Sequence, residues 1–154
     1  MSRIILLQGI ASHLAKQRSI SANGHGVCQY RAPSGNKCAI GGILPPELFS
    51  PLIESKDIST MFDYADSPKS TVDPSETAAC RRVVNWLCEQ MPEITDRNIA
   101  ASVLFSAQRY HDDTGGHCYE TELITAKNTP GMSDEVLATR IFTELKARTD
   151  ALCG

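Results

Sequence analysis

Hydrophobic residues recur at helical spacing along most of the chain, and loops rich in Gly, Pro, Ser and Asn separate these stretches. From about residue 2 to 18, one face of a predicted helix carries Ile4, Leu7, Ala11 and Leu14. Further helices are predicted over residues 45–54, 57–65, 76–91, 96–113, 119–127 and from 133 onward. The pattern therefore indicates a mainly helical chain.

Residues 28–41 interrupt this helical pattern. Two short runs, 28–31 and 37–41, flank a Pro-Ser-Gly-Asn turn, which is typical of a β-hairpin. Gly41 and Gly42 follow, and they allow the backbone to approach a ligand or a packed helix closely. We therefore predict a mainly α (α+β) fold with five to seven helices and one small β-hairpin near residues 28–41.

Composition and net charge narrow the class of protein. The 154 residues suit a single domain spanning 1–154, and 42% hydrophobic with 21% charged residues is ordinary for a globular protein. A net charge of −3 argues against a nucleic-acid partner. No apolar run approaches ~18 residues, so we predict no membrane partner, and the first apolar run is a poor signal peptide. We therefore expect a cytoplasmic protein with reduced thiols.

Charge is distributed unevenly along the chain. The first 46 residues carry five basic residues and no acidic one, whereas the remainder carries all 18 acidic residues. Such asymmetry can mark a patch for an acidic partner or a phosphate. It can equally reflect attraction between two parts of one fold.

The six cysteines do not form a metal-binding pattern. There is no C-x-x-C pair, and the spacing of Cys28 and Cys38 matches no structural zinc site. Cys80 and Cys88 lie on the apolar face of a predicted helix, where free cysteine behaves as a small hydrophobic residue. Nucleotide-binding loops are absent as well, so the sequence predicts no metal and no cofactor.

Two places in the sequence carry candidate chemistry: the predicted hairpin, with Cys38, and the end of the helix over 96–113. In that helix Gln108, His111 and Asp112 stand at positions i, i+3 and i+4, which share a face. Cys38 is then a candidate nucleophile, His111 its base, and Asp112 or Gln108 an orienting group. Against this reading, Cys38 resembles a strand residue, and adjacent His111 and Asp112 have difficulty pointing at each other within one helix turn.

Arg31 and Lys37 leave two further readings open. They would lower the pKa of the Cys38 thiol in an enzyme, or hold the phosphate of a small ligand in a binding protein. A structural reading stands beside both, because Cys28 and Cys38 can pack a hairpin onto helices while His111 is favoured near a helix C-terminus.

These residues also carry a resemblance to a family of small proteins encoded mainly by bacteriophages and prophages. The shared pattern is C-x-Y-R-x3-G-x-K-C-A-I/V-G, then an aliphatic pair, a proline–acid helix start, a glutamate, and a helix ending in Q-x-x-H-D. The matching residues are Cys28, Tyr30, Arg31, Gly35, Lys37, Cys38, Ala39, Ile40, Gly41, Ile43, Leu44, Pro45, Glu47, Glu54, Gln108, His111 and Asp112. The resemblance covers roughly residues 4–127, so residues 133–154 look like a C-terminal helical addition.

The resemblance implies a phage gene product that acts in the cytoplasm of the host bacterium. In that setting we expect a small interaction protein that binds and inhibits a host protein, such as a component of a defence system, as an anti-CRISPR protein does. Candidate contact residues are Tyr30, Phe49, Phe62 and Tyr64, and the candidate binding residues of the motifs are Tyr30, Arg31, Lys37 and Gln108. The alternatives are a cysteine-dependent hydrolase or transferase that uses Cys38, His111 and Asp112, and a binder of a small phosphorylated host signal.

Overall fold

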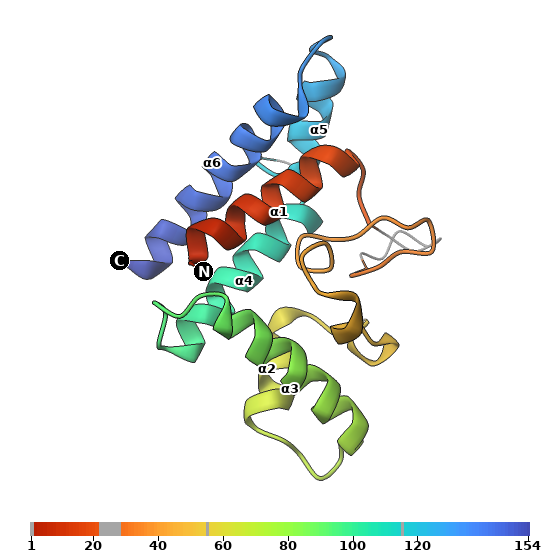
Figure 1. Ribbon diagram of the computed structural model, residues 1–154, viewed down its shortest axis with the longest axis vertical. Helices are drawn as coiled ribbons and strands as arrows, with labels where there is room; N and C mark the ends of the chain where they lie inside the picture. Colours follow the sequence, from red (N-terminus) through yellow and green to blue (C-terminus); the bar gives the residue numbers. More distant parts are fainter. Residues whose placement is uncertain (1, 22–28, 55, 115) are drawn as a thin grey trace.

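The computed structural model describes residues 2–21, 29–54, 56–114 and 116–154, and this part of the chain is mainly helical (Figure 1). Two short 3₁₀-helices, η1 and η2, precede the second of six α-helices. The elements are α1 (Arg3–Gln17), η1 (Pro46–Leu48), η2 (Pro51–Ile53), α2 (Ile58–Asp66), α3 (Pro74–Glu89), α4 (Arg97–Asp112), α5 (Tyr119–Lys127) and α6 (Asp134–Cys153). The helical class and most of the predicted helices are therefore confirmed.

Short polar side chains fix where most of the helices begin. The side-chain oxygen of each accepts a hydrogen bond from a backbone N–H of the first turn, which otherwise lacks a partner. These N-cap residues are Ser2, Asp57, Asp73, Asp96 and Ser133. The single helix predicted over 45–54 is instead two 3₁₀ turns, because Pro51 has no N–H with which to continue a helix from η1.

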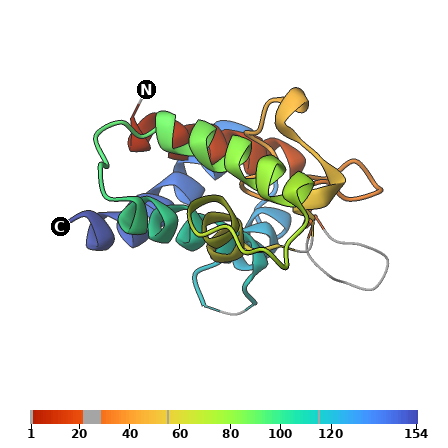
Figure 2. The ribbon, with the colours of Figure 1, turned by 90° about the horizontal axis from the view of Figure 1, so that it is seen from below.

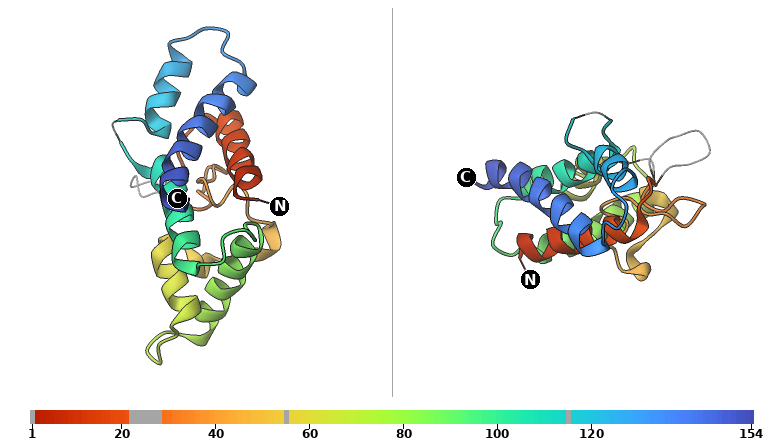
Figure 3. Two further views of the ribbon diagram at one scale, coloured as in Figure 1. Left: turned by 90° about the vertical axis from the view of Figure 1, so that its left-hand side faces the viewer. Right: turned by 90° about the horizontal axis from the view of Figure 1, so that it is seen from above.

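Helix α4 lies at the centre of the fold and packs against α2 on one side and against α5 and α6 on the other. Helix α1 runs along α6, and α2 and α3 form an antiparallel pair at the opposite end of the molecule (Figures 1 and 3). Seen from below, segment 29–54 projects beside these helices and next to the end of α1 (Figure 2). The C-terminal end of α4 meets α5, where the rings of Tyr110 and His111 lie near that of Tyr119.

The predicted β-hairpin near residues 28–41 is not supported. Of the described residues in this stretch, Arg31 and Lys37 form a single isolated antiparallel bridge, and no strand is present between residues 29 and 54. Cys28 lies outside the described residues. The mainly helical class stands, but an irregular segment, residues 29–44, takes the place of the expected β-hairpin.

Side chains from elsewhere explain why this segment does not extend into strands. The Glu54 carboxylate accepts the N–H groups of Tyr30 and Arg31 at 2.8 and 3.2 Å. The Gln17 amide of α1 accepts the N–H of Lys37 at 2.7 Å and donates to its carbonyl at 2.8 Å. Two hairpin-type bonds flank the bridge, from the Ala32 N–H to the Asn36 carbonyl at 2.8 Å and from the Cys38 N–H to the Tyr30 carbonyl at 3.3 Å. The pairing goes no further because Glu54 takes the Tyr30 N–H and the Cys38 carbonyl accepts the Gly42 N–H instead.

One apolar core runs through the molecule and includes the buried faces of all six α-helices. The buried face of α6 comprises Leu137, Ile141, Leu145 and Thr149, and α6 packs on α1 and α4. Across the described part of the chain, none of the helices has the length and apolar character needed to cross a membrane.

Candidate functional site

The fold brings the two predicted motifs together. Segment 29–44 contacts α1 through Lys37 and contacts α4 through Ile40, whose N–H points to the Gln108 side-chain oxygen at 3.4 Å. Residues from three distant parts of the chain therefore meet in one polar cluster, defined here as Ser21, Cys38, Gln108, His111 and Asp112.

His111 is fully buried at the centre of this cluster. Its Nε2 accepts the backbone N–H of Ser21 at 3.1 Å, so the ring proton must reside on Nδ1. Nδ1 then donates to the Asp112 carboxylate, 2.7 Å away. The ring also stacks on Tyr119 of α5 at a centroid distance of 5.6 Å. Both ring nitrogens are thus engaged in contacts that hold the fold together.

The pairing of His111 with Asp112 shows how the fold overcomes the expected difficulty of adjacent helix residues facing each other. Adjacent residues on a helix diverge by about 100°. Asp112 is the last residue of α4, however, and the Gln108 amide one turn earlier donates to its Oδ1 at 2.9 Å. This second hydrogen bond holds the carboxylate toward the imidazole.

Cys38 begins a helical turn rather than lying in a strand. The carbonyl of Cys38 accepts the N–H of Gly42 at 3.0 Å, and its Sγ accepts the N–H of Gly41 at 3.2 Å. The side chain is completely buried, and this burial raises the pKa of the thiol to about 12 despite the hydrogen bonds from Gly41, Ile40 and Gln108. At neutral pH the group is therefore a thiol, whereas the nucleophile in cysteine catalysis is the thiolate.

The arrangement places Cys38, Gln108 and Asp112 in one cluster without forming a nucleophile–base pair. Among the described contacts, no hydrogen bond joins Cys38 to His111, and the imidazole has no free lone pair. The geometry instead suits a structural role, in which each polar group satisfies another.

Gly41 and Gly42 lie against the Tyr30 backbone and the His13 ring rather than against an open cavity. A Cβ atom on Gly41 would lie 1.9 Å from the Tyr30 carbonyl oxygen. A Cβ atom on Gly42 would lie 2.0 Å from the His13 ring of α1. Burial lowers the pKa of His13, so the ring is neutral, and its Nε2 contacts the Lys37 carbonyl at 3.1 Å. The glycines thus allow segment 29–44 to pack tightly on α1.

Of the predicted binding residues Tyr30 and Arg31, the first is buried and the second is half-buried. Tyr30 is 5% exposed, and its hydroxyl donates to the Lys56 carbonyl at 2.6 Å. The Arg31 guanidinium lies over the Phe49 ring, 4.4 Å from its centroid. The bridge places Arg31 and Lys37 opposite each other, yet the Arg31 side chain stacks on an aromatic ring, so phosphate binding by this pair stays a prediction.

The other candidate contact aromatics are also covered. Phe62 is 7% exposed, and the Arg97 guanidinium lies 5.7 Å from the centroid of its ring. Tyr64 is partly buried beneath the Lys56 ammonium at 5.7 Å. In the described ranges, His, Cys, Asp and Glu side chains form no group of three that could hold a metal ion.

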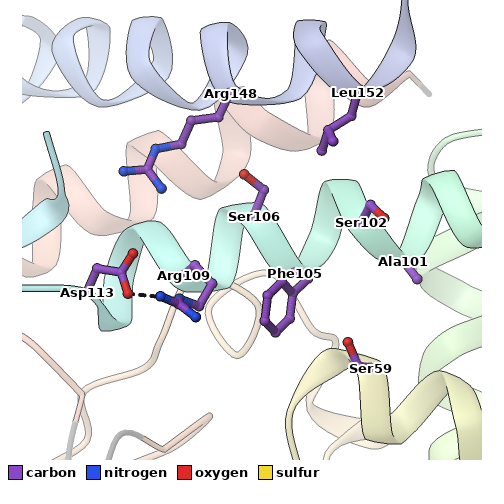
Figure 4. Close-up of a pocket in the computed structure, with 9 residues that line it drawn as sticks. All are labelled: Ser59, Ala101, Ser102, Phe105, Ser106, Arg109, Asp113, Arg148 and Leu152. Carbon is purple, nitrogen blue, oxygen red and sulfur yellow. Dashed lines mark hydrogen bonds and ion pairs between the residues drawn. The ribbon is translucent and has the colours of Figure 1, made fainter.

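A groove of about 530 Å³ opens on the surface between α4 and α6 (Figure 4). Phe105 of α4 and Leu152 of α6 supply its apolar lining. The Arg109 guanidinium lies over the Phe105 ring, 5.8 Å from its centroid, on the side of the groove where Asp113 and Arg148 lie. The remaining lining residues are Ser59, Ala101, Ser102 and Ser106. Leu152 is 40% exposed, so this groove presents apolar surface that the core does not use.

Sequence reasoning did not single out this groove, although a signal is present. Ala101, Phe105, Arg109 and Asp113 recur every four residues, which places them on one face of α4. The pattern alone does not reveal that Leu152, far along the chain, forms the opposite wall.

Comparisons with known proteins identify no relative, since no protein-family model, no curated protein and no solved structure matches the chain. The resemblance to phage and prophage proteins therefore stays a prediction that rests on its motif residues.

Proposed function

We propose that the chain is a small phage-encoded interaction protein that binds a host bacterial protein in the host cytoplasm, such as a component of a defence system, and inhibits it. The groove between α4 and α6 carries this proposal, because it presents the exposed Leu152 and the partly buried Phe105 on two helices that pack against each other. Exposed apolar surface rimmed by polar side chains is typical of a protein interaction site. The phage context comes from the resemblance of the two motifs.

The state of the motif residues supports binding over catalysis. Cys38 is buried as a thiol, and His111 uses both ring nitrogens within the fold. In this proposal the motif residues stabilise the fold, and the exposed surface of the helices binds the partner. The cysteine-dependent enzyme is the alternative, and the reactivity of Cys38 decides between them.

The first test is native mass spectrometry of the tagged protein recovered from an extract of the host bacterium. We expect a stoichiometric complex with one host protein. In the Leu152→Glu variant we expect at least about tenfold weaker affinity for that protein, because a carboxylate replaces an anchor at the apolar end of the groove.

Val136→Glu is the matched control. Val136 is also on α6 and is 51% exposed, but it does not line the groove. The control should bind like the parent chain and unfold at the same temperature as Leu152→Glu. Recovery of the chain at its bare mass, or equal binding by Leu152→Glu and the parent, would contradict the proposal.

A further inference from the structure

We propose that the occupant of the α4–α6 groove is an acidic–aliphatic peptide segment, with a carboxylate held at the Arg109–Arg148 end and an aliphatic side chain against Phe105 and Leu152. This inference rests on the proposed function and names the chemistry of the partner.

Unused hydrogen-bond donors mark the carboxylate end. Arg109 donates through Nε to Asp113 at 2.8 Å, and its side chain is 55% exposed. Arg148 donates through Nε to Glu144 and through Nη2 to the carbonyl of His117. Among the contacts within the described residues, the two Nη atoms of Arg109 and Nη1 of Arg148 have no acceptor. Guanidinium groups with free N–H pairs bind carboxylates in a bidentate manner.

Free N–H groups, rather than an excess of positive charge, favour a carboxylate at this end. Arg109 pairs with Asp113 and Arg148 with Glu144 through Nε, so each guanidinium keeps Nη atoms for a further acceptor. Figure 4 shows both guanidinium groups at the same end of the groove as Asp113, with Leu152 and Ala101 at the opposite end. A partner that carries a negative charge at one end and an apolar group at the other matches this separation.

The dimensions suit a short segment of protein. From Ala101 to Asp113 the α4 wall is about 18 Å long at the rise of an α-helix, which corresponds to about five or six residues of extended chain. A volume of about 530 Å³ lies within the usual range of ligand sites. The hydroxyl groups of Ser102 and Ser106 lie along this wall and can bond to the backbone of such a segment.

The test is selection of peptides from a displayed library of random decapeptides on the immobilised full chain. We expect enrichment of peptides that contain Asp or Glu about two residues from Leu, Ile or Val. Phe105 and Arg109, like Arg148 and Leu152, are one helical turn or about 6 Å apart, and two residues of extended chain span about that distance. On Arg109→Glu the same selection should lose the acidic preference, and the affinity for a selected acidic peptide should fall at least tenfold.

Arg140→Glu provides the matched control, because Arg140 is on α6, is 45% exposed, pairs with Glu122 and does not line the groove. The control should keep the acidic preference. Enrichment of neutral or basic peptides on the parent chain, or an unchanged preference on Arg109→Glu, would overturn the inference. If a host protein is captured and bound equally by the parent and Arg109→Glu, the binding function stands while the acidic occupant is refuted.

Discussion

Replacing Gly41 with alanine is expected to lower the free energy of unfolding by about 3 kcal/mol or more. The added methyl carbon would lie 1.9 Å from the carbonyl oxygen of Tyr30 and 2.7 Å from its carbonyl carbon. These are backbone atoms, and Glu54 and Lys56 hold Tyr30 in place, so relief of the clash requires the segment itself to move. Denaturant titration followed by circular dichroism measures the loss.

Gly9→Ala is the matched control for Gly41→Ala. Gly9 lies inside α1, and a Cβ there would meet Ile43 at 3.8 Å, an ordinary contact. Alanine is favoured over glycine in a helix interior by about 0.5–1 kcal/mol, so this variant should be more stable than the parent. A Gly41→Ala protein as stable as Gly9→Ala would refute the close packing of segment 29–44.

Replacing His111 with alanine is expected to lower the free energy of unfolding by about 3–5 kcal/mol, as truncation of a buried aromatic ring does. The change removes the acceptor for the Ser21 N–H, the partner of Asp112 and the ring stacked on Tyr119. A buried N–H without an acceptor adds its own penalty. Thermal and denaturant unfolding of the variant measure the effect.

Two further variants keep the His111 prediction testable if the alanine protein does not fold. In His111→Gln the side-chain oxygen can accept the Ser21 N–H, so the loss should be smaller than for alanine. His117→Ala makes the same deletion at an exposed position and should change stability by less than about 0.5 kcal/mol. If His111→Ala and His117→Ala are equally stable, His111 does not hold the fold together.

The helices could be predicted from sequence because their signals are local. The signals for α4 lie within one stretch of chain: Asp96 at its start, the apolar positions that follow, and the cluster Thr114–Gly116 after its end. The predicted boundaries therefore agree closely with Arg97–Asp112. The irregular segment could not be predicted in the same way, because the side chains of Gln17 and Glu54, distant in sequence, take several of its backbone groups. Local residue preferences indicated a hairpin, of which one bridge forms, and Glu54 takes the Tyr30 N–H that would extend the pairing.

The candidate site was predicted in its membership but not in its geometry. The sequence identified Cys38, Gln108, His111 and Asp112 as residues that folding brings together. It did not reveal that Ser21, 90 positions before His111, occupies the imidazole Nε2. Nor did it reveal that Cys38 is fully buried, because burial depends on the packing of several helices. These two facts favour the structural reading of the cluster over the catalytic one, both of which the sequence leaves open.

The reactivity of Cys38 tests this interpretation most directly. The native chain is labelled with a thiol reagent at neutral pH, and peptide mass spectrometry follows each described cysteine, with the exposed Cys153 as the internal reference. We expect labelling of Cys38 to be at least about a thousandfold slower than labelling of Cys153 and to rise with denaturant in step with global unfolding. Labelling of Cys38 in the folded chain at a rate equal to or above that of Cys153 would contradict the structural role of the cluster.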